Sequence, residues 1–265
     1  MIKRHLNIIK KSLKKLGIYL TNNHSLNLSK IKKSMSILEN IFSIHNLNSK
    51  DFRELIKYCK ENNFLSLFQK SYETYEINLE KEFAKSFIKE KNNNDKNNLK
   101  KYHFYNGYLA AVKKEASLAR IKPNDKVAFI GSGAMPMTAI ILYELKEASI
   151  DCIEKDGESV ELSKKIIKKL KYDKYIKVIN RNAIDLNFSK YSVILLAVMS
   201  KPKNNLMKVV WKSILPGTRI VYRLPNIVRQ ALYEDTSNVI NTYRKFEKKR
   251  VRRKGSSTLI LLVKN

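Results

Sequence analysis

The residues with the clearest capacity for chemistry follow a short apolar run. Residues 127–130 are apolar and end at Gly131, Ser132 and Gly133, after which residues 136–147 have a helical pattern. Glycine lets the backbone turn sharply and approach a ligand closely, so a strand, a glycine loop and a helix in this order are typical of a nucleotide-type cofactor site. The same residues also fit an ordinary turn between a strand and a helix.

Two further residues narrow the ligand that the loop would bind. Glu154 stands 21 positions after Gly133, at the end of a second apolar run, where a carboxylate accepts hydrogen bonds from ribose hydroxyls. Pro136 occupies the place of a third glycine and gives G-x-G-x-x-P. Proline removes a backbone N–H that a pyrophosphate would use. We therefore predict a ligand without a diphosphate, and S-adenosylmethionine is such a ligand.

Short apolar segments alternate with amphipathic ones through the second half of the chain. Strands are expected at residues 127–131, 150–154, 176–180, 193–198 and 218–223, and helices at 136–147, 157–170 and 203–214. This alternation predicts a parallel sheet with both faces covered. Residues 243–250 and 257–263 have no helix between them and should form an antiparallel pair. The fold class is therefore α/β, a Rossmann-like sheet of the class I methyltransferase type with an antiparallel pair at its end.

Residues directly after the later strands should also contact the ligand, because a parallel sheet binds it at the carboxyl ends of its strands. Asn182 and Ala183 follow the third strand, and Ala197 follows the fourth. Asn182 fits a hydrogen bond to an adenine edge and equally fits an ordinary turn.

The two halves of the chain differ in composition. All five prolines lie between residues 123 and 225, while residues 1–100 have none and show helical periodicity. We therefore expect a helical lid domain over residues 1–100 and a catalytic domain over residues 101–265. Ser49, followed by Lys50 and Asp51, marks an expected helix start.

Charge and composition bound the partners and the location of the chain. The 265 residues include 53 Lys and Arg but 24 Asp and Glu, a formal charge of +29. This charge fits a lysine-rich solvated surface better than a nucleic-acid site, although residues 248–254 are a dense basic run. Two cysteines and four scattered histidines indicate neither a disulfide framework nor a metal site. We expect a soluble cytoplasmic protein without a membrane partner, and the oligomeric state is left open.

Three stretches resemble a known family. VAFIGSGAMPMT at residues 127–138, DCIEKDGESVELSKKII at 151–167 and TRIVYRLPNIVRQALYED at 218–235 are similar to nicotianamine synthases, particularly the shorter archaeal ones. The resemblance covers about residues 100–265. Ala134 and Met135 are more similar to bacterial relatives that make opine-type metallophores.

The resemblance implies a particular use of S-adenosylmethionine. The family transfers its 3-amino-3-carboxypropyl group to an amine and releases methylthioadenosine, and the acceptor is S-adenosylmethionine itself or an amino acid such as glutamate or histidine. No metal is required, although the products are metallophores. Two alternatives stay open: a methyltransferase that acts on nucleic acid, and a non-catalytic RNA-binding protein. Against the first, residues 197–202 contain no base-handling motif.

The resemblance also implies which residues carry the reaction. Glu115 matches the family's catalytic glutamate, Tyr108 lies on the same helical face, and Tyr105 is a second hydroxyl that could assist. A glutamate base for an ammonium needs its pKa raised by burial, or it orients the ammonium while water takes the proton. From the residues alone, Glu115 fits an exposed partner of the neighbouring lysines at least as well.

Substrate carboxylates need cationic or hydroxyl partners, and the third stretch offers three. Arg223 would bind a carboxylate through two parallel hydrogen bonds. Tyr222 and Tyr233 would add hydroxyl groups. An arginine at the end of a strand is also a common structural residue.

Overall fold

The computed structural model describes residues 2–22, 28–43, 47–91, 95–243, 246–251 and 257–265. These residues divide into two compact units. The first contains the chain up to Asn78 together with Pro225–Asp235, and the second contains Leu79–Leu224 and most of the described residues after Asp235. The units therefore interleave along the sequence. The role of the N-terminal helices as a lid stays a prediction.

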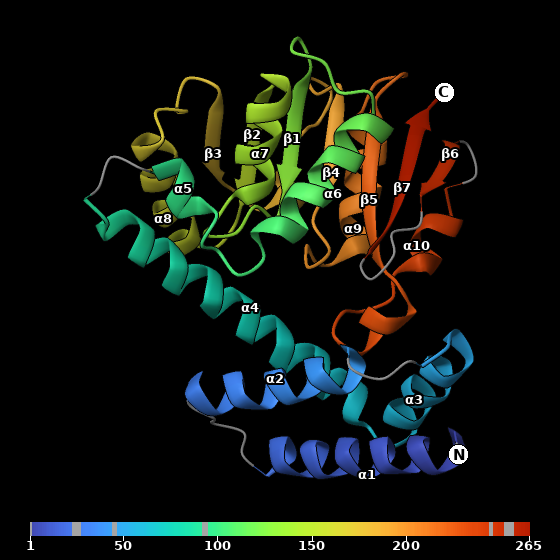
Figure 1. Ribbon diagram of the computed structural model, residues 1–265. Coiled ribbons are helices and arrows are strands. Elements are labelled where there is room, and N and C mark those ends of the chain that lie inside the picture. The colour runs from blue at the N-terminus through green and yellow to red at the C-terminus, as the bar shows by residue number, and fades with distance from the viewer. Residues whose placement is uncertain (1, 23–27, 44–46, 92–94, 244–245, 252–256) are drawn as a thin grey trace. The chain divides into compact units, whose positions relative to one another are not determined.

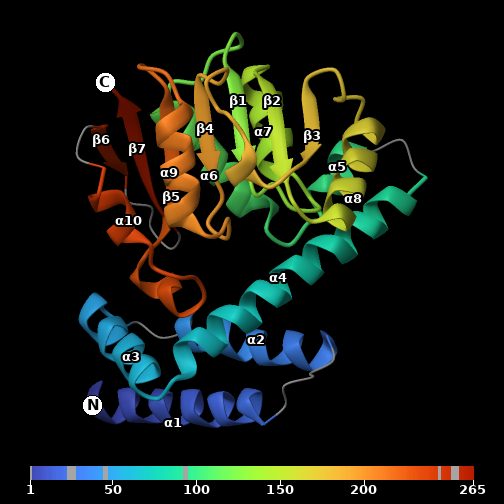
Figure 2. The ribbon, with the colours of Figure 1, turned by 180° about the vertical axis from the view of Figure 1, so that it is seen from behind.

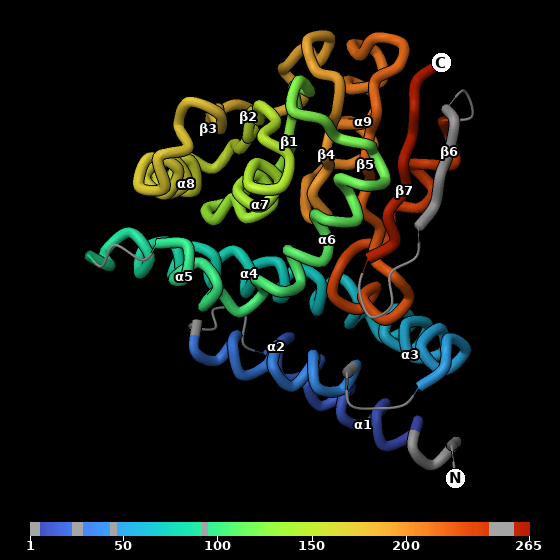
Figure 3. The backbone as a smooth tube through the Cα atoms, turned by 45° about the horizontal axis from the view of Figure 1, so that its top comes forward, coloured from blue at the N-terminus to red at the C-terminus, as the bar shows by residue number. Residues whose placement is uncertain are grey.

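The first unit is helical. It contains α1 (Ile2–Thr21), α2 (Leu28–Ser43), α3 (Ser49–Glu61) and the first half of α4 (Phe64–Lys89), and Figure 3 shows α1 and α2 side by side. Helix α3 begins at Ser49, as the sequence predicted. The side chain of Asn48 accepts hydrogen bonds from the backbone N–H groups of Lys50 and Asp51, while the Asp51 carboxylate accepts from Asn48 N–H. This capping box satisfies N–H groups that the first turn would otherwise leave unpaired.

The second unit contains a seven-stranded sheet in the order β3-β2-β1-β4-β5-β7-β6 (Figure 1). The strands are β1 (Lys126–Ile130), β2 (Ser149–Glu154), β3 (Ile176–Asn180), β4 (Val193–Leu196), β5 (Arg219–Pro225), β6 (Phe246–Val251) and β7 (Ser257–Lys264). Strands β1 to β5 pair in parallel, and β6 pairs with β7 antiparallel. The predicted fold class is confirmed.

Helices cover both faces of this sheet because side chains alternate along each strand. Val127 and Phe129 on β1 pack with α6 (Tyr105–Leu118), α7 (Met137–Lys146) and α8 (Gly157–Lys169). Ala128 and Ile130 pack on the other face with α9 (Lys203–Ser213) and α10 (Ser237–Asn241). Figures 1 and 2 show α7 on the one face and α9 on the other. Two separate apolar cores therefore hold the strands in place.

The strand order reverses direction at β1. Strand β1 pairs with β2 on one side and with β4 on the other. The connection after β1 therefore leads to β2, toward one edge of the sheet, and the connection after β4 leads to β5, toward the other edge. A ligand binds at such a switch point in open α/β sheets, outside the carboxyl ends of the strands. The loops after β1 and β4 meet there: a Cβ atom on Gly131 would lie 3.1 Å from the Cβ atom of Ser200.

The expected strands and helices of the second unit lie within a few residues of their predicted bounds. In the terminal pair, β6 is described from Phe246 to Val251, where residues 243–250 were predicted, and β7 ends at Lys264, one residue later than predicted. Within the basic run, residues 248–251 lie on β6, and residues 252–254 lie outside the described residues. Cys59 and Cys152 are buried free thiols. Among the described helices, none has the length and apolar character needed to cross a bilayer.

Candidate functional site

The glycine loop has a backbone conformation that its residue types explain. Gly131 and Gly133 have φ angles of +78° and +70°, in a region that residues with a side chain adopt only at a cost. Gly131 N–H donates to the carbonyl of Ile153, 2.9 Å away, at the end of β2. Ser132 between the glycines is buried. Pro136 then caps α7, and its carbonyl accepts from Ile140 N–H.

Gly133 lies between two carboxylates. Its N–H donates to Glu154 Oε2 at 3.0 Å. On the other side, a Cβ atom at this position would overlap the carboxylate of Glu80, which comes from α4. The backbone angle therefore favours glycine at residue 133, and a side chain there would also have to displace the Glu80 carboxylate.

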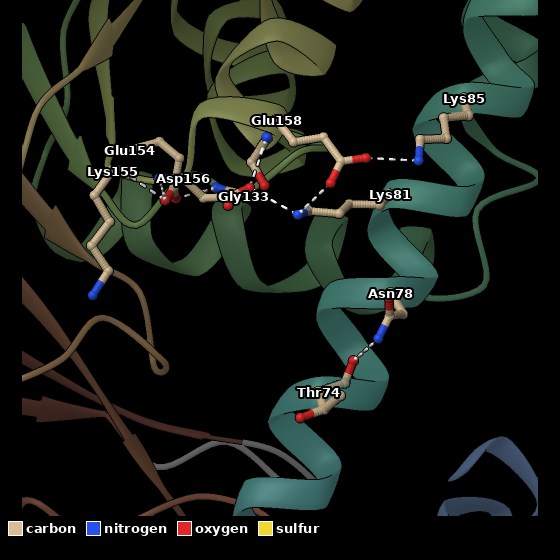
Figure 4. A network of polar contacts seen from close by, with 10 residues as sticks. Thr74, Asn78, Lys81, Lys85, Gly133, Glu154, Lys155, Asp156 and Glu158 are labelled. Carbon is tan, nitrogen blue, oxygen red and sulfur yellow. Dashed lines mark hydrogen bonds and ion pairs between the residues drawn. The ribbon is translucent and has the colours of Figure 1, made fainter. Parts of the chain in front are cut away.

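The carboxylate of Glu154 is held by three backbone donors (Figure 4). Besides the bond from Gly133, Glu154 Oε1 accepts from Lys155 N–H at 2.8 Å and from Asp156 N–H at 3.0 Å. These bonds fix the direction of the carboxylate at the end of β2. The ribose-binding role of Glu154 stays a prediction, and this orientation supports it.

Glu80 also lies near Tyr108, which the sequence predicted to be a catalytic residue. The hydroxyl of Tyr108 on α6 donates to Glu80 Oε1 at 3.5 Å. From the sequence, Glu115 was the carboxylate expected beside Tyr108, and Glu80 was not identified. Helix α4 contains several glutamates, and no spacing within it distinguishes Glu80 from the others.

Glu115 has a different environment from the one expected. Its side chain is fully buried, and its two oxygens accept from Arg223 Nε and Arg223 Nη2, both at 2.7 Å. Arg223 Nη2 also donates to Thr138 Oγ1 at 3.0 Å. Burial alone would lower the pKa of Arg223, but the ion pair with Glu115 outweighs it and raises that pKa.

This pair bears on two predicted roles, that of Glu115 in catalysis and that of Arg223 in substrate binding. Glu115 is not an open carboxylate beside Tyr108, because both of its oxygens are bonded to Arg223. Arg223 in turn presents a fork already filled by a carboxylate of its own chain. The exposed surface glutamate considered as the alternative for residue 115 is equally excluded by its burial. The pairing favours a structural role for both residues, and their predicted functional roles stay predictions.

Two of the other predicted hydroxyl groups, those of Tyr222 and Tyr105, belong to the second unit. Tyr222 is buried and donates to Thr236 Oγ1 at 2.8 Å. Tyr105 is half-buried, and burial and then the nearby Glu144 raise its pKa. Tyr233 belongs to the first unit. The catalytic role of Tyr105 and the substrate-binding roles of Tyr222 and Tyr233 stay predictions.

Tyr233 is part of a polar cluster in the first unit. Its hydroxyl donates to Glu76 Oε1 at 2.6 Å, and Tyr72 likewise donates to Glu39 Oε1 at 2.5 Å. Burial raises the pKa of Glu76 to about 7, although the bond from Tyr233 and the charge of Arg229 act against the rise. The Glu76 carboxyl should therefore keep its proton to a higher pH than an exposed glutamate does.

The residues after β3 and β4 have mainly local contacts. Asn182 is exposed, and its side chain accepts from Ile184 N–H at 3.4 Å at the start of the short helix η1 (Ala183–Asp185), which makes it a turn residue here. Ala183 is buried. The carbonyl of Ala197 accepts from Ser200 Oγ at 2.8 Å and from the Lys203 ammonium. Their contacts with a ligand stay predictions.

Potential metal ligands are not clustered in the part of the chain that the structure describes. No group of three or more His, Cys, Asp or Glu residues there has an arrangement that could hold a metal ion. The chemistry available at Gly133 is that of two carboxylates and a phenol.

Solved structures share this fold over nearly the whole chain. MtNAS in complex with MTA and tNA has a TM-score of 0.83 at 24% identity, and the match covers 98% of each chain. A glutamate-to-glutamine variant of MtNAS in complex with S-adenosylmethionine has a TM-score of 0.83 at 23% identity, covering 97% of this chain and 98% of that one. At these identities, the likeness shows the fold.

Sequence comparisons give the family. The L-histidine 2-aminobutanoyltransferase of Yersinia pestis is 24% identical over 123 residues, and the match spans about half of each protein, 46% of this chain and 46% of that one. The family described as nicotianamine synthase protein matches residues 26–260, which is most of the chain. The chain belongs to the nicotianamine synthase family.

Proposed function

We propose that the protein transfers the 3-amino-3-carboxypropyl group of S-adenosylmethionine to an amine and releases methylthioadenosine. The observation that carries this proposal is the pair of carboxylates at Gly133. Glu154 on one side suits a ribose, and Glu80 on the other suits an amine. Membership of the nicotianamine synthase family supports the same reaction.

The reaction is a displacement at carbon. The lone pair of the acceptor nitrogen forms a bond to the methionine γ-carbon, and the bond from that carbon to sulfur breaks. Its electron pair stays on sulfur, so the positively charged sulfonium becomes the neutral thioether of methylthioadenosine. The acceptor nitrogen loses one proton. The same sulfonium could instead lose its methyl group, and the direction from which the nitrogen approaches selects the product.

The enzyme contributes binding and orientation. In the proposed complex, the Glu154 carboxylate accepts hydrogen bonds from the ribose hydroxyls, and the glycine loop gives the ligand close access to the backbone. Alignment of the acceptor with the carbon–sulfur bond can supply about 7–11 kcal/mol of the barrier reduction. The carboxylate of Glu154 is suited to orienting the ribose, because three backbone N–H groups already fix its direction.

Glu80 is our candidate for the residue that handles the acceptor amine. Its carboxylate lies beside Gly133 and accepts from the Tyr108 hydroxyl. A carboxylate there attracts the ammonium form of the acceptor and accepts one of its protons, which frees the nitrogen lone pair for the attack on carbon. Tyr108 would act here as the donor that orients Glu80, and Glu80 would take the place that the sequence predicted for Glu115.

The acceptor belongs to the amino acids or to S-adenosylmethionine itself. The curated relative from Yersinia pestis is named for L-histidine, which supports a histidine-like acceptor here, and glutamate is the other amino acid to test. Transfer between two molecules of S-adenosylmethionine would instead begin a chain of aminocarboxypropyl units. A cytoplasmic location, where free amino acids are available, is part of this proposal.

The test is product analysis of the purified protein. It is incubated with S-adenosylmethionine alone, with histidine and with glutamate, and the nucleoside products are separated by mass spectrometry. Methylthioadenosine supports the proposal, and S-adenosylhomocysteine as the sole product would refute it in favour of methyl transfer. Glu80→Gln should lower the turnover number at least 100-fold with little change in the affinity for S-adenosylmethionine. Glu82→Gln, an exposed glutamate on the same helix, is the matched control.

A further inference from the structure

A group of charged residues ties helix α4 to the start of α8 (Figure 4). Lys81 Nζ lies 2.9 Å from Asp156 Oδ1 and 2.8 Å from Glu158 Oε2. Lys85 Nζ, one turn further along α4, lies 2.7 Å from Glu158 Oε1. The side chain of Lys81 is 17% exposed and that of Lys85 is 54% exposed. Lys81 is therefore the better-shielded cation of the two.

Asp156 connects this group to the candidate ribose acid. Its carboxylate accepts from Ser159 N–H at 2.8 Å and thereby caps α8, while its own N–H donates to Glu154 Oε1 at 3.0 Å. Glu154 accepts in turn from Gly133. A continuous path of polar contacts thus runs from Lys81 through Asp156 and Glu154 to Gly133.

Helix α4 connects the two ends of this path, because it contains both Lys81 and the residue that lies against Gly133. Gly133 lies against the Glu80 carboxylate, and Glu80 is the residue directly before Lys81. Neighbouring residues on a helix point in different directions, so Lys81 can bond to Asp156 while Glu80 reaches Gly133. The ion pair of Lys81 and the position of Glu80 against Gly133 together fix this turn of α4, both along the helix axis and in its rotation about that axis.

We propose that Lys81 is a positioning residue that sets the distance between the Glu80 carboxylate and the Glu154 carboxylate by binding α4 to Asp156 and Glu158. The proposal rests on the proposed function, because it concerns the placement of Glu80. Lys85 adds a second, weaker attachment through Glu158 alone.

The bond between Lys81 and Asp156 stays charged over the pH range of an enzyme assay. The hydrogen bond from Ser159 and the contact with Lys81 lower the pKa of Asp156 to about 2. Exposed ion pairs add little to stability, typically about 0–1 kcal/mol. The effect of this one should therefore show in the geometry of the site more than in the stability of the fold.

Lys81→Met should lower the turnover number about 10- to 100-fold, since a displacement of about 1 Å at a reacting group can cost about 100-fold. The dissociation constant of S-adenosylmethionine, measured by calorimetry, should change less than 3-fold, because Glu154 and Gly133 keep their mutual bond. Lys81→Arg should restore most of the turnover, as it keeps the charge and the reach. Lys85→Met should lower turnover less than 3-fold, and Lys57→Met, on an exposed pair of α3, should leave it unchanged.

A double variant tests the contacts of Lys81 by changing its two carboxylate partners on α8 and at its N-cap. Asp156→Asn with Glu158→Gln keeps a helix-capping side chain and the backbone bond to Glu154, but removes both carboxylates that bind Lys81. It should lose as much turnover as Lys81→Met, and the triple variant should lose no more than either. These variants also provide the test if Lys81→Met does not fold.

The outcomes separate this inference from the proposed function. If the wild-type protein forms no methylthioadenosine, the proposed function fails before Lys81 is tested. If the wild type is active and Lys81→Met keeps its turnover within 2-fold, Lys81 does not position Glu80. Additive losses in the triple variant, or no rescue by Lys81→Arg, would equally overturn the inference.

Discussion

The buried pair of Glu115 and Arg223 gives the sharpest test of our assignment of roles. We expect Arg223→Met to destabilise the second unit strongly, because it leaves a fully buried carboxylate without its cation. Loss of one partner from a buried pair costs about 3–5 kcal/mol. In a chain of this size, about 2–4 °C of melting temperature is lost per kcal/mol, so the expected drop is roughly 6–20 °C.

The double variant Glu115→Leu with Arg223→Met distinguishes a structural pair from a catalytic one. It removes both charges together, and such replacements of buried pairs are often neutral. We expect it to melt within a few degrees of the wild type, above either single variant, and to retain methylthioadenosine formation. Thermal unfolding and product analysis on the same samples measure both quantities. Glu115→Leu that melts normally but loses turnover 1,000-fold would refute our reasoning and return the catalytic role to Glu115.

Three further predictions concern single residues. Gly133→Ala should weaken S-adenosylmethionine binding at least 10-fold in calorimetry, because the alanine would need a φ of +70° and its Cβ atom would displace the Glu80 carboxylate. Gly157→Ala is the control, since a Cβ atom added there meets nothing within 4 Å. Equal affinities for S-adenosylmethionine in the two variants would contradict this geometry. Burial raises the pKa of Glu76 from 4.5 to about 7, so the folded state binds the proton more tightly and its stability should fall as the pH rises from about 4.5 to about 7. Urea titrations across this range should show that slope in the wild type and a smaller one in Glu76→Gln, and an unchanged slope would count against the raised pKa. Asn48→Ala removes the cap of α3 and should cost about 0.5–2 kcal/mol of unfolding free energy; a change below about 0.3 kcal/mol would show that the capping box contributes little.

Local signals were enough to predict the fold of the second unit. Strands β1, β2 and β4 are short, largely apolar runs, and α8 has an apolar face along one side, so period and length together indicated alternating strands and helices. The interleaving of the two units could not be predicted in this way. It depends on the packing of residues 225–235 with the N-terminal helices, which are far away in the sequence.

The part of the candidate site that depends on strand ends and turns could be predicted from the sequence. The glycine loop and Glu154 follow from strand ends and spacing, and both lie where they were expected. The identity of the second carboxylate depends on which helix reaches Gly133, and sequence patterns do not contain this information. Glu115 has the right type and face but meets an arginine from β5, 108 residues away, while Glu80 comes from a helix whose other glutamates look the same in sequence.

The interleaved first unit has a consequence for how the protein is made. Gln69 on α4 donates to the carbonyls of Gln230 and Tyr233, so the helical unit includes a piece that leaves the ribosome roughly 150 residues after the rest of it. The N-terminal helices must wait, incompletely packed, until most of the sheet has been synthesised. A truncated chain that stops before residue 225 would therefore expose apolar helix surfaces and depend on chaperones for its solubility.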